Sequence, residues 1–170
     1  MTSPLDIRAA VPGDIPVLHP LIERAYRGDS ARLGWTHEAD LVPGARTDRA
    51  TLEAIVADPA SRLLIAERDG HLIGCVHVAD LGAARAYLGM LCVEPGLQGA
   101  GLGKRLIDAA ETRAREAFHA ARIEMTVIEN RTELLAYYQR RGYAPTGEHR
   151  PFPVETDPPL RLVVLVKPLD

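Results

Sequence analysis

Lysine, cysteine and long apolar runs are scarce in this chain. Of its 20 basic residues only Lys104 and Lys167 are lysines, and 23 acidic residues give a formal net charge of −3. Nucleic-acid-binding and membrane-surface proteins rely on a broad cationic field, so this balance argues against both classes of partner. No run approaches the ~18 apolar residues of a membrane span, and residues 1–14 lack a basic segment followed by an apolar one. We therefore predict a cytoplasmic protein.

The two cysteines are too few for a disulfide framework, and the six histidines have no metal-ligand spacing. Cys75 and Cys92 are predicted to be small buried apolar residues that face each other on adjacent strands. A chain of 170 residues, 46% hydrophobic and 25% charged, is long enough to form one core without disulfides or metal. We expect a single domain over residues 1–170 and no metal site.

The apolar periodicity predicts a mixed α/β sheet with helices on its faces. Strands are expected at residues 5–10, 63–67, 72–79, 86–93, 123–128, 143–148 and 160–166. Helices are expected at residues 15–25, between Asp48 and Asp58, and at 101–117 and 132–141. Asp69-Gly70 is typical of a β-hairpin turn. Residues 27–46 contain several glycines and prolines and are expected to form a long loop, which in a small domain is usually functional or mobile.

A glycine-rich turn between a strand and a helix carries the clearest chemical signal. After Val93-Glu94-Pro95 and two further residues, the chain continues Gln98-Gly99-Ala100-Gly101-Leu102-Gly103-Lys104. Glycines lack the Cβ atoms that would keep a phosphate from the backbone, and the first amides of a helix have no partner within it. These N–H groups and the helix dipole both favour an anion. The segment therefore predicts phosphate binding without a basic patch.

Several interpretations of this turn, each with a different ligand or with none, can be compared. A P-loop is excluded because Gln98 stands where it needs glycine and Arg105 where it needs a hydroxyl. A dinucleotide-binding turn fits in part, with Glu124 or Glu129 as the acidic partner, but Lys104 replaces its third glycine. The turn could also be an anion-free bend whose glycines serve packing. The remaining ligand class is acyl-coenzyme A.

The turn resembles motif A of the GNAT N-acetyltransferases, in which a strand ending in Val-x-Pro precedes Gln/Arg-x-x-Gly-x-Gly/Ala and a helix. Residues 131–143 resemble motif B of the same family, with Tyr138 four residues before Gly142-Tyr143. The resemblance extends over nearly the whole chain. It implies the acyl-CoA N-acyltransferase fold, an α/β (α+β) fold with a mixed six- to seven-stranded sheet and about four helices. It also implies an acetyl-CoA-dependent N-acetyltransferase.

The same resemblance implies roles for individual residues. The free backbone edge of the motif A strand would pair with the pantetheine arm, and the following turn would hold the pyrophosphate. The implied cofactor-binding residues are Leu91, Cys92, Val93, Gln98, Gly99, Ala100, Gly101, Leu102, Gly103, Lys104, Asn130 and Arg131. The last two are alternatives, because the family's asparagine position falls on Arg131 while Asn130 lies one residue earlier. Tyr138 is the expected general acid, since a phenol pKa near 10 is matched to a thiol leaving group. Its alternative role is packing.

The acceptor side is predicted from the loop between the first two helices and from a later aromatic. Residues 26–30, 34–41, 146–148 and 151–153 resemble an uncharacterised bacterial subset of the family, which names no substrate. Trp35 and its aromatic partners could wall a pocket, Glu38 and Asp40 could hold an amine, and Arg27 or Arg32 could hold a carboxylate. The predicted substrate-binding residues are Tyr26, Arg27, Trp35, Glu38, His77 and Phe152.

The general base and the acceptor stay open at this level. His77, Glu38 and water are the candidates for the base. A small zwitterionic or amino-acid-like amine fits the charges of the loop. Two alternatives are an enzyme that acetylates a protein or peptide amine and a non-catalytic acyl-CoA-binding module. The expected partner is a small-molecule amine, with a homodimer as a further possibility.

Overall fold

The structure is a computed structural model that describes residues 4–26, 47–97, 101–153 and 155–169. Its strands are β1 (Asp6–Ala9), β2 (Ser61–Arg68), β3 (His71–Gly82), β4 (Arg85–Val93), β5 (Arg122–Ile128), β6 (Ala144–Pro151) and β7 (Arg161–Pro168). Its helices are α1 (Ile15–Tyr26), α2 (Arg49–Ala57), α3 (Leu102–Phe118) and α4 (Thr132–Arg140), with 3₁₀ turns at Pro12–Asp14 and Pro95–Leu97. The predicted order of elements is confirmed.

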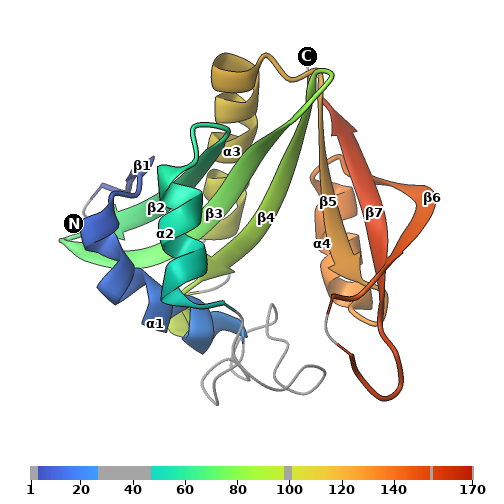
Figure 1. Ribbon diagram of the computed structural model, residues 1–170, viewed down its shortest axis with the longest axis horizontal. Coiled ribbons are helices and arrows are strands. Elements are labelled where there is room, and N and C mark those ends of the chain that lie inside the picture. Colours follow the sequence, from blue (N-terminus) through green and yellow to red (C-terminus); the bar gives the residue numbers. More distant parts are fainter. Residues whose placement is uncertain (1–3, 27–46, 98–100, 154, 170) are drawn as a thin grey trace.

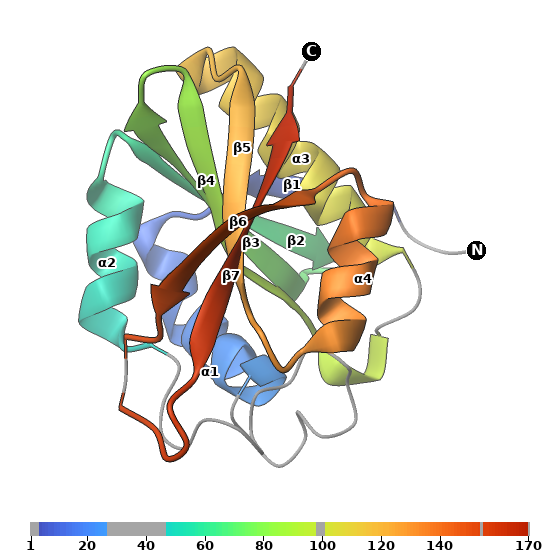
Figure 2. The same cartoon turned by 90° about the vertical axis from the view of Figure 1, so that its right-hand side faces the viewer.

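The seven strands form one sheet in the order β1-β2-β3-β4-β5-β7-β6. All neighbours are antiparallel except β4 and β5, which are parallel. Figure 2 shows α1 and α2 on one face of this sheet and α3 and α4 on the other. The prediction of a mixed sheet of six to seven strands with about four helices is confirmed, and the sheet has seven strands.

Local sequence explains where several elements turn or begin. Asp69 and Gly70 have φ angles of 54° and 78°, so both occupy the left-handed region that a two-residue hairpin turn of this kind requires. The side chain of Asp48 accepts a hydrogen bond from the Thr51 amide at 2.7 Å and caps α2. Strands β3 and β6 run three residues beyond their predicted ends, because pairing with β4 and β7 extends them past the apolar pattern.

The side chains of each strand alternate between two core clusters. Leu64 and Val76 pack with α3, whereas Ile65 and Cys75, one residue away in each strand, pack with α1 and α2. Cys75 and Cys92 are directly opposite in β3 and β4, and their buried Sγ atoms lie 3.3 Å apart. The prediction that they are small buried residues facing each other is confirmed.

The sheet opens between β4 and β5. These strands pair only where Arg85, Ala86 and Tyr87 lie beside residues 122–124. Figure 1 shows them close together at the top and separating toward the bottom. The opened part of β4 contains a bulge at Met90, whose φ is 50°, and the register with β3 shifts there. Beyond Tyr87, β4 therefore pairs with β3 alone.

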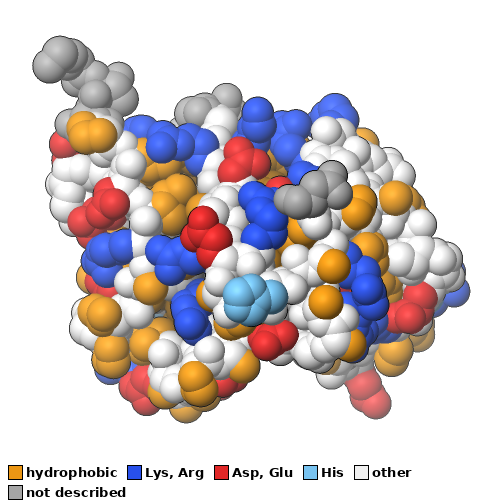
Figure 3. Space-filling view, turned by 90° about the horizontal axis from the view of Figure 1, so that it is seen from above, with side chains coloured by type: hydrophobic (Ala, Val, Ile, Leu, Met, Phe, Trp, Pro, Cys, Tyr) orange, Lys and Arg blue, Asp and Glu red, His pale blue; other side chains and the backbone are white. Residues whose placement is uncertain are grey.

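The surface agrees with the mild net charge. On the face shown in Figure 3, basic and acidic side chains of the described residues are intermixed. None of the helices in the described ranges is both long enough and apolar enough to cross a membrane.

Candidate active site

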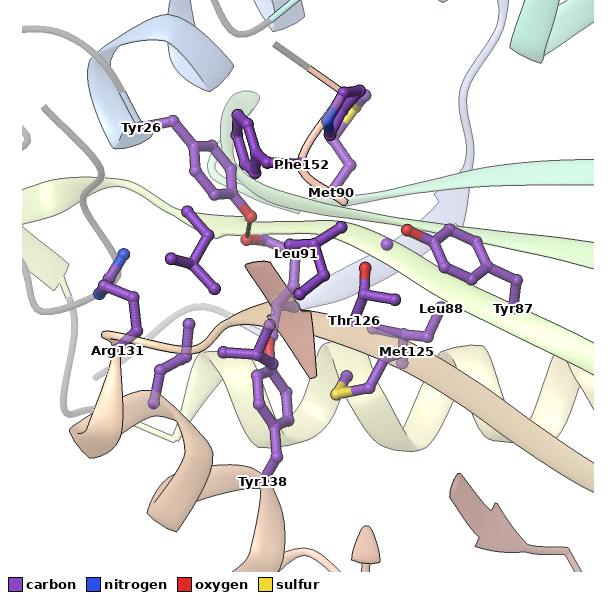
Figure 4. A pocket seen from close by; sticks show the side chains of 16 residues that line it. Tyr26, Tyr87, Leu88, Met90, Leu91, Met125, Thr126, Arg131, Tyr138 and Phe152 are labelled. Atoms are coloured by element: carbon purple, nitrogen blue, oxygen red, sulfur yellow. Dashed lines mark hydrogen bonds between the residues drawn. The ribbon is translucent and has the colours of Figure 1, made fainter. Parts of the chain in front are cut away.

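A cavity of about 330 Å³ lies where β4 and β5 separate (Figure 4). Its walls come from these two strands and β7, the end of α1, both halves of α4, and the connection between β6 and β7. The lining residues are Tyr26, Tyr87, Leu88, Gly89, Met90, Leu91, Met125, Thr126, Val127, Ile128, Arg131, Leu134, Tyr138, Phe152, Pro153 and Leu162. Most are apolar, and among these described residues Arg131 is the one with a charged side chain.

The open edge of β4 presents backbone groups to this opening. The Glu94 amide donates to the Ile73 carbonyl of β3 at 2.8 Å. Successive residues of a strand direct their N–H and C=O groups to opposite sides, so those of Val93 and Leu91 project from the edge away from β3. Because β5 does not pair there, the N–H groups of Leu91 and Val93 and the Val93 carbonyl can pair with an extended ligand, whereas the Leu91 carbonyl accepts from the Tyr26 hydroxyl.

Two side chains hold the bulge of β4 in place. The Tyr26 hydroxyl donates to the Leu91 carbonyl, a contact drawn in Figure 4, and the Cys75 thiol donates to the Met90 carbonyl at 3.4 Å. A peptide unit is planar, so a fixed Met90 carbonyl also fixes the direction of the Leu91 N–H. The end of α1 is fastened to the same strand end by Arg24, whose Nη2 lies 2.7 Å from Glu94 Oε2.

Tyr138 extends from α4 toward the open strands (Figure 4). Its ring is buried and contacts Tyr137 and Tyr143 edge to face, with centroids 5.3 and 6.0 Å apart. Burial raises the pKa of the Tyr138 phenol, and the neighbouring Tyr137 acts in the same direction. Arg131 has the opposite effect on this pKa, because a positive charge favours the phenolate. The pKa of Tyr138 therefore lies above the value near 10 expected from the sequence, and the phenol is protonated at neutral pH, as a general acid must be.

A polar network lies next to Tyr138 in the core. The Tyr143 hydroxyl donates to Glu111 Oε2 at 2.9 Å, and Lys167 Nζ donates to both oxygens of the same carboxylate at 2.9 and 3.1 Å. Burial and the nearby carboxylate raise the pKa of Tyr143. The network joins Glu111 of α3 and Lys167 of β7 to Tyr143, which lies between α4 and β6. Because the Tyr143 ring contacts Tyr138, it helps to fix the position of the phenol.

Sequence reasoning missed Glu111 and Lys167. The available signal was a carboxylate within the apolar stripe of α3, since Glu111 lies between Ile107 and Ala114 at helical spacing and is itself buried. A buried carboxylate without a partner is costly, so the pattern predicts a hydrogen-bonding partner. It does not reveal which residue supplies it.

The start of α3 has the geometry of an anion site. Gly101 opens the helix with a φ of 81° and no side-chain cap, so the amides of residues 102–104 have no helical acceptor. A Cβ at Gly103 would lie 3.0 Å from the Tyr137 hydroxyl, so glycine there allows α4 to approach this turn. These donors suit a pyrophosphate. Gln98, Gly99 and Ala100, which were predicted to share this role, lie outside the described residues.

The structure brings part of the predicted substrate site together. Tyr26 and Phe152 line the cavity, as does Arg131, whereas Asn130 is exposed and does not line it. The predicted Arg27, Trp35 and Glu38 lie outside the described residues.

His77 does not reach the cavity. It lies two residues after Cys75, so its side chain is on the α1 and α2 face of β3. Its Nε2 is 3.0 Å from the Ser61 hydroxyl, and burial lowers the pKa of the imidazole. The side chain of Cys92 also faces this side, toward Cys75. The backbone groups of Cys92 are directed toward β3, so Cys92, which was predicted to bind the cofactor, presents neither its side chain nor its backbone groups to the opening.

Comparison with known proteins identifies relatives. The profile of the acetyltransferase (GNAT) family matches residues 24–143. An IAA acetyltransferase of Azospirillum brasilense is 30% identical over 114 residues, which cover 66% of this chain and 73% of that protein. The structure of yncA, a putative acetyltransferase from Salmonella typhimurium with its cofactor acetyl-CoA, has a TM-score of 0.75 at 19% identity over 99% of this chain and 95% of that one.

Further solved structures share the fold but not the acceptor. The ribosomal-protein-S18-alanine N-acetyltransferase from Escherichia coli has a TM-score of 0.75 at 15% identity, covering 98% of this chain and 95% of that chain. A spermidine N-acetyltransferase chimera from Vibrio cholerae and hSSAT has a TM-score of 0.74 at 19% identity, covering 97% and 95%. Because their names give different acceptors at equal structural likeness, the acceptor must be argued from the site itself.

Proposed function

This chain belongs to the GNAT acetyltransferase family and uses acetyl-CoA as its co-substrate, and we propose that it transfers the acetyl group to a primary amine of a small molecule by direct attack in a ternary complex. The observation that carries the proposal is the cavity between β4 and β5, where the protonated Tyr138 lies opposite an unpaired strand edge. We expect one catalytic domain over residues 1–170 that acts in the cytoplasm.

The described residues offer fitting partners for acetyl-CoA, which supplies an activated acetyl thioester when bound. The amides of residues 102–104 would hold the pyrophosphate at the start of α3. The open edge of β4 at Leu91 and Val93 would pair with the amide groups of the pantetheine arm. An N–H group of this edge is also suited to polarise the thioester carbonyl.

Tyr138 would act as the general acid. It donates its phenolic proton to sulfur as the C–S bond breaks and the acceptor nitrogen forms the new N–C bond. The proton that the amine loses passes to water and restores the phenol. A positioned general acid contributes about 10²–10⁴-fold to a rate.

Free-thiol release from acetyl-CoA with a panel of amines tests the function. Tyr138→Phe is expected to lower kcat by about 10²–10⁴-fold and to leave the acetyl-CoA-induced rise in melting temperature unchanged. Gln139→Ala is the control, because Gln139 is adjacent on α4 but is exposed and does not line the cavity. A non-catalytic acyl-CoA-binding module would instead show the melting shift with acetyl-CoA and no thiol release with any amine. Equal kcat in Tyr138→Phe and the wild type would exclude the acid role.

A further inference from the structure

Resting on this proposed function, we infer that the acceptor is a small amine with a bulky apolar body and a carboxylate, and that Arg131 pairs with the carboxylate. The class includes apolar and aromatic amino acids. It excludes polyamines, which have no carboxylate and several cationic groups.

The lining of the cavity selects the apolar body. Figure 4 shows Tyr26 and Phe152 across the cavity from Tyr138. The apolar residues Pro153, Ile128, Leu134 and Leu162 also line it. Phe152 packs with Ile128 and Leu162 in a small core cluster of its own, so this wall is built and not a loose loop contact. At about 330 Å³ the cavity is near the lower end of small-molecule sites. It must also admit the acetyl group, so the acceptor is small.

The charge of the cavity selects the carboxylate. Arg131 is the charged residue among the described lining residues, which include no Asp or Glu. It belongs to the turn that opens α4, where its amide donates to the Ile128 carbonyl at 2.9 Å. Figure 4 shows Arg131 and Tyr87 at opposite ends of the cavity, with Tyr138 between them. An arginine fork binds a carboxylate through two parallel hydrogen bonds, and a cationic amine is repelled by it.

The same arrangement favours the reactive form of the amine. An ammonium group that enters an apolar cavity loses hydration, which lowers its pKa, and a nearby guanidinium lowers it further. The nitrogen is then neutral and nucleophilic without a carboxylate base among the described residues of the cavity. Because Arg131 holds the carboxylate of the acceptor, the amine of the acceptor is directed away from the guanidinium and toward Tyr138.

Matched acceptors test the inference. Phenylalanine, phenylalaninamide and phenylethylamine have the same body and differ at the carboxylate, and leucine, tryptophan and spermidine complete the panel. We expect the wild type to use the amino acids with kcat/KM at least about tenfold above the amide and the amine, as a charge-assisted hydrogen bond provides. Arg131→Gln should remove this preference and leave the KM for acetyl-CoA unchanged. Arg131→Lys should restore it in part, because lysine keeps the charge but not the fork.

Arg140→Gln is the control, because Arg140 is an exposed residue of the same helix outside the cavity. Equal use of phenylalanine and phenylethylamine by the wild type would overturn the inference, as would a preference for spermidine. A rise in the KM for acetyl-CoA in Arg131→Gln, with the acceptor preference intact, would assign Arg131 to the co-substrate instead. If Arg131→Gln does not fold, the wild-type comparison alone decides.

Binding of the acetylated products separates this inference from the proposed function. If no amine releases thiol, the proposed function fails, and melting-temperature shifts still measure the carboxylate site. N-acetylphenylalanine should then stabilise the wild type more than N-acetylphenylethylamine does, and Arg131→Gln should abolish the difference. Equal shifts with the two compounds would overturn the carboxylate site itself.

Discussion

The two edges of β4 differ in how far they are paired with a neighbouring strand and in what they border. Toward β3 the strand is paired along its length apart from the bulge at Met90 and a register shift near its start, and Gly74 of β3 allows close approach of the backbone. Toward β5 only Arg85, Ala86 and Tyr87 are paired, and the rest of the edge borders the cavity. One edge of β4 is therefore held by β3, and most of the other edge is accessible to a ligand. We expect changes at the closed edge to lower stability, and changes at the open edge to lower turnover.

The largest expected loss of stability comes from the network that joins the two sides of the opening. Glu111→Leu removes the acceptor of the Tyr143 hydroxyl and of Lys167 Nζ. We expect a loss of about 3 kcal/mol in the free energy of unfolding, measured with denaturant, because buried polar partners are left unpaired. Glu116→Gln, an exposed carboxylate on the same helix, should change it by less than about 0.5 kcal/mol. Equal stability of the two variants would show that the network contributes nothing.

Gly74→Ala perturbs the closed edge directly. The added Cβ would lie 2.8 Å from the Cys92 carbonyl oxygen and 2.9 Å from Leu106 Cδ1, so the backbone must shift. We expect a loss of about 2 kcal/mol of stability with kcat of the folded enzyme retained. Gly13→Ala serves as the control because its added Cβ has no atom within 4 Å. A folded Gly74→Ala with wild-type stability and low kcat would reverse the roles assigned to the two edges.

Tyr26→Phe perturbs the open edge by removing the hydroxyl that holds the Leu91 carbonyl. The stability loss should be only about 1 kcal/mol, as for a typical hydrogen bond. We expect kcat to fall about tenfold, with a smaller change in the KM for acetyl-CoA, because the ring still lines the cavity. Steady-state kinetics and denaturant unfolding of the same preparation measure both. Lower stability with unchanged kcat would make this bond purely structural.

The smallest effect is expected at His77, which lies on the closed side. Burial lowers its pKa below the ordinary value of 6.5, so near and below pH 6.5 the unfolded chain binds a proton that the folded chain does not. Stability should therefore fall as the pH is lowered through this region, and His77→Gln should flatten that part of the curve. His71→Gln, at an exposed position, is the control. A loss of the acidic limb of kcat/KM in His77→Gln would instead support a role as base, because a general base acts in its deprotonated form.

Sequence reasoning found the elements and two local motifs, because each depends on neighbours along the chain. The Asp69-Gly70 turn needs only two residues that accept positive φ. The glycine opening of α3 and the placement of Tyr138 on α4 follow in the same way from spacing within one turn and helix. The acetyl-CoA dependence was implied by the resemblance of these two motifs to those of the family.

The contacts that complete the site join residues far apart in the chain. Tyr26 and Leu91 are separated by 65 residues, and Glu111 and Lys167 by 56. No periodicity relates such positions, since each pair meets only after the sheet and its helices have assembled. The lining of the cavity also joins distant parts of the chain, because it draws on three strands, two helices and the β6–β7 connection.

The composition and hydrophobic periodicity of the chain were sufficient for its mixed α/β fold class, and its two motifs were sufficient for the resemblance to its family. Only the assembled sheet shows which side of β3 His77 occupies, because a shift of one residue in register would reverse it. The opening between β4 and β5, and the side chains that hold the Met90 bulge, likewise arise from strand pairing that ends at Tyr87. Pairing and register are long-range properties, so they depend on the whole chain and not on any one segment.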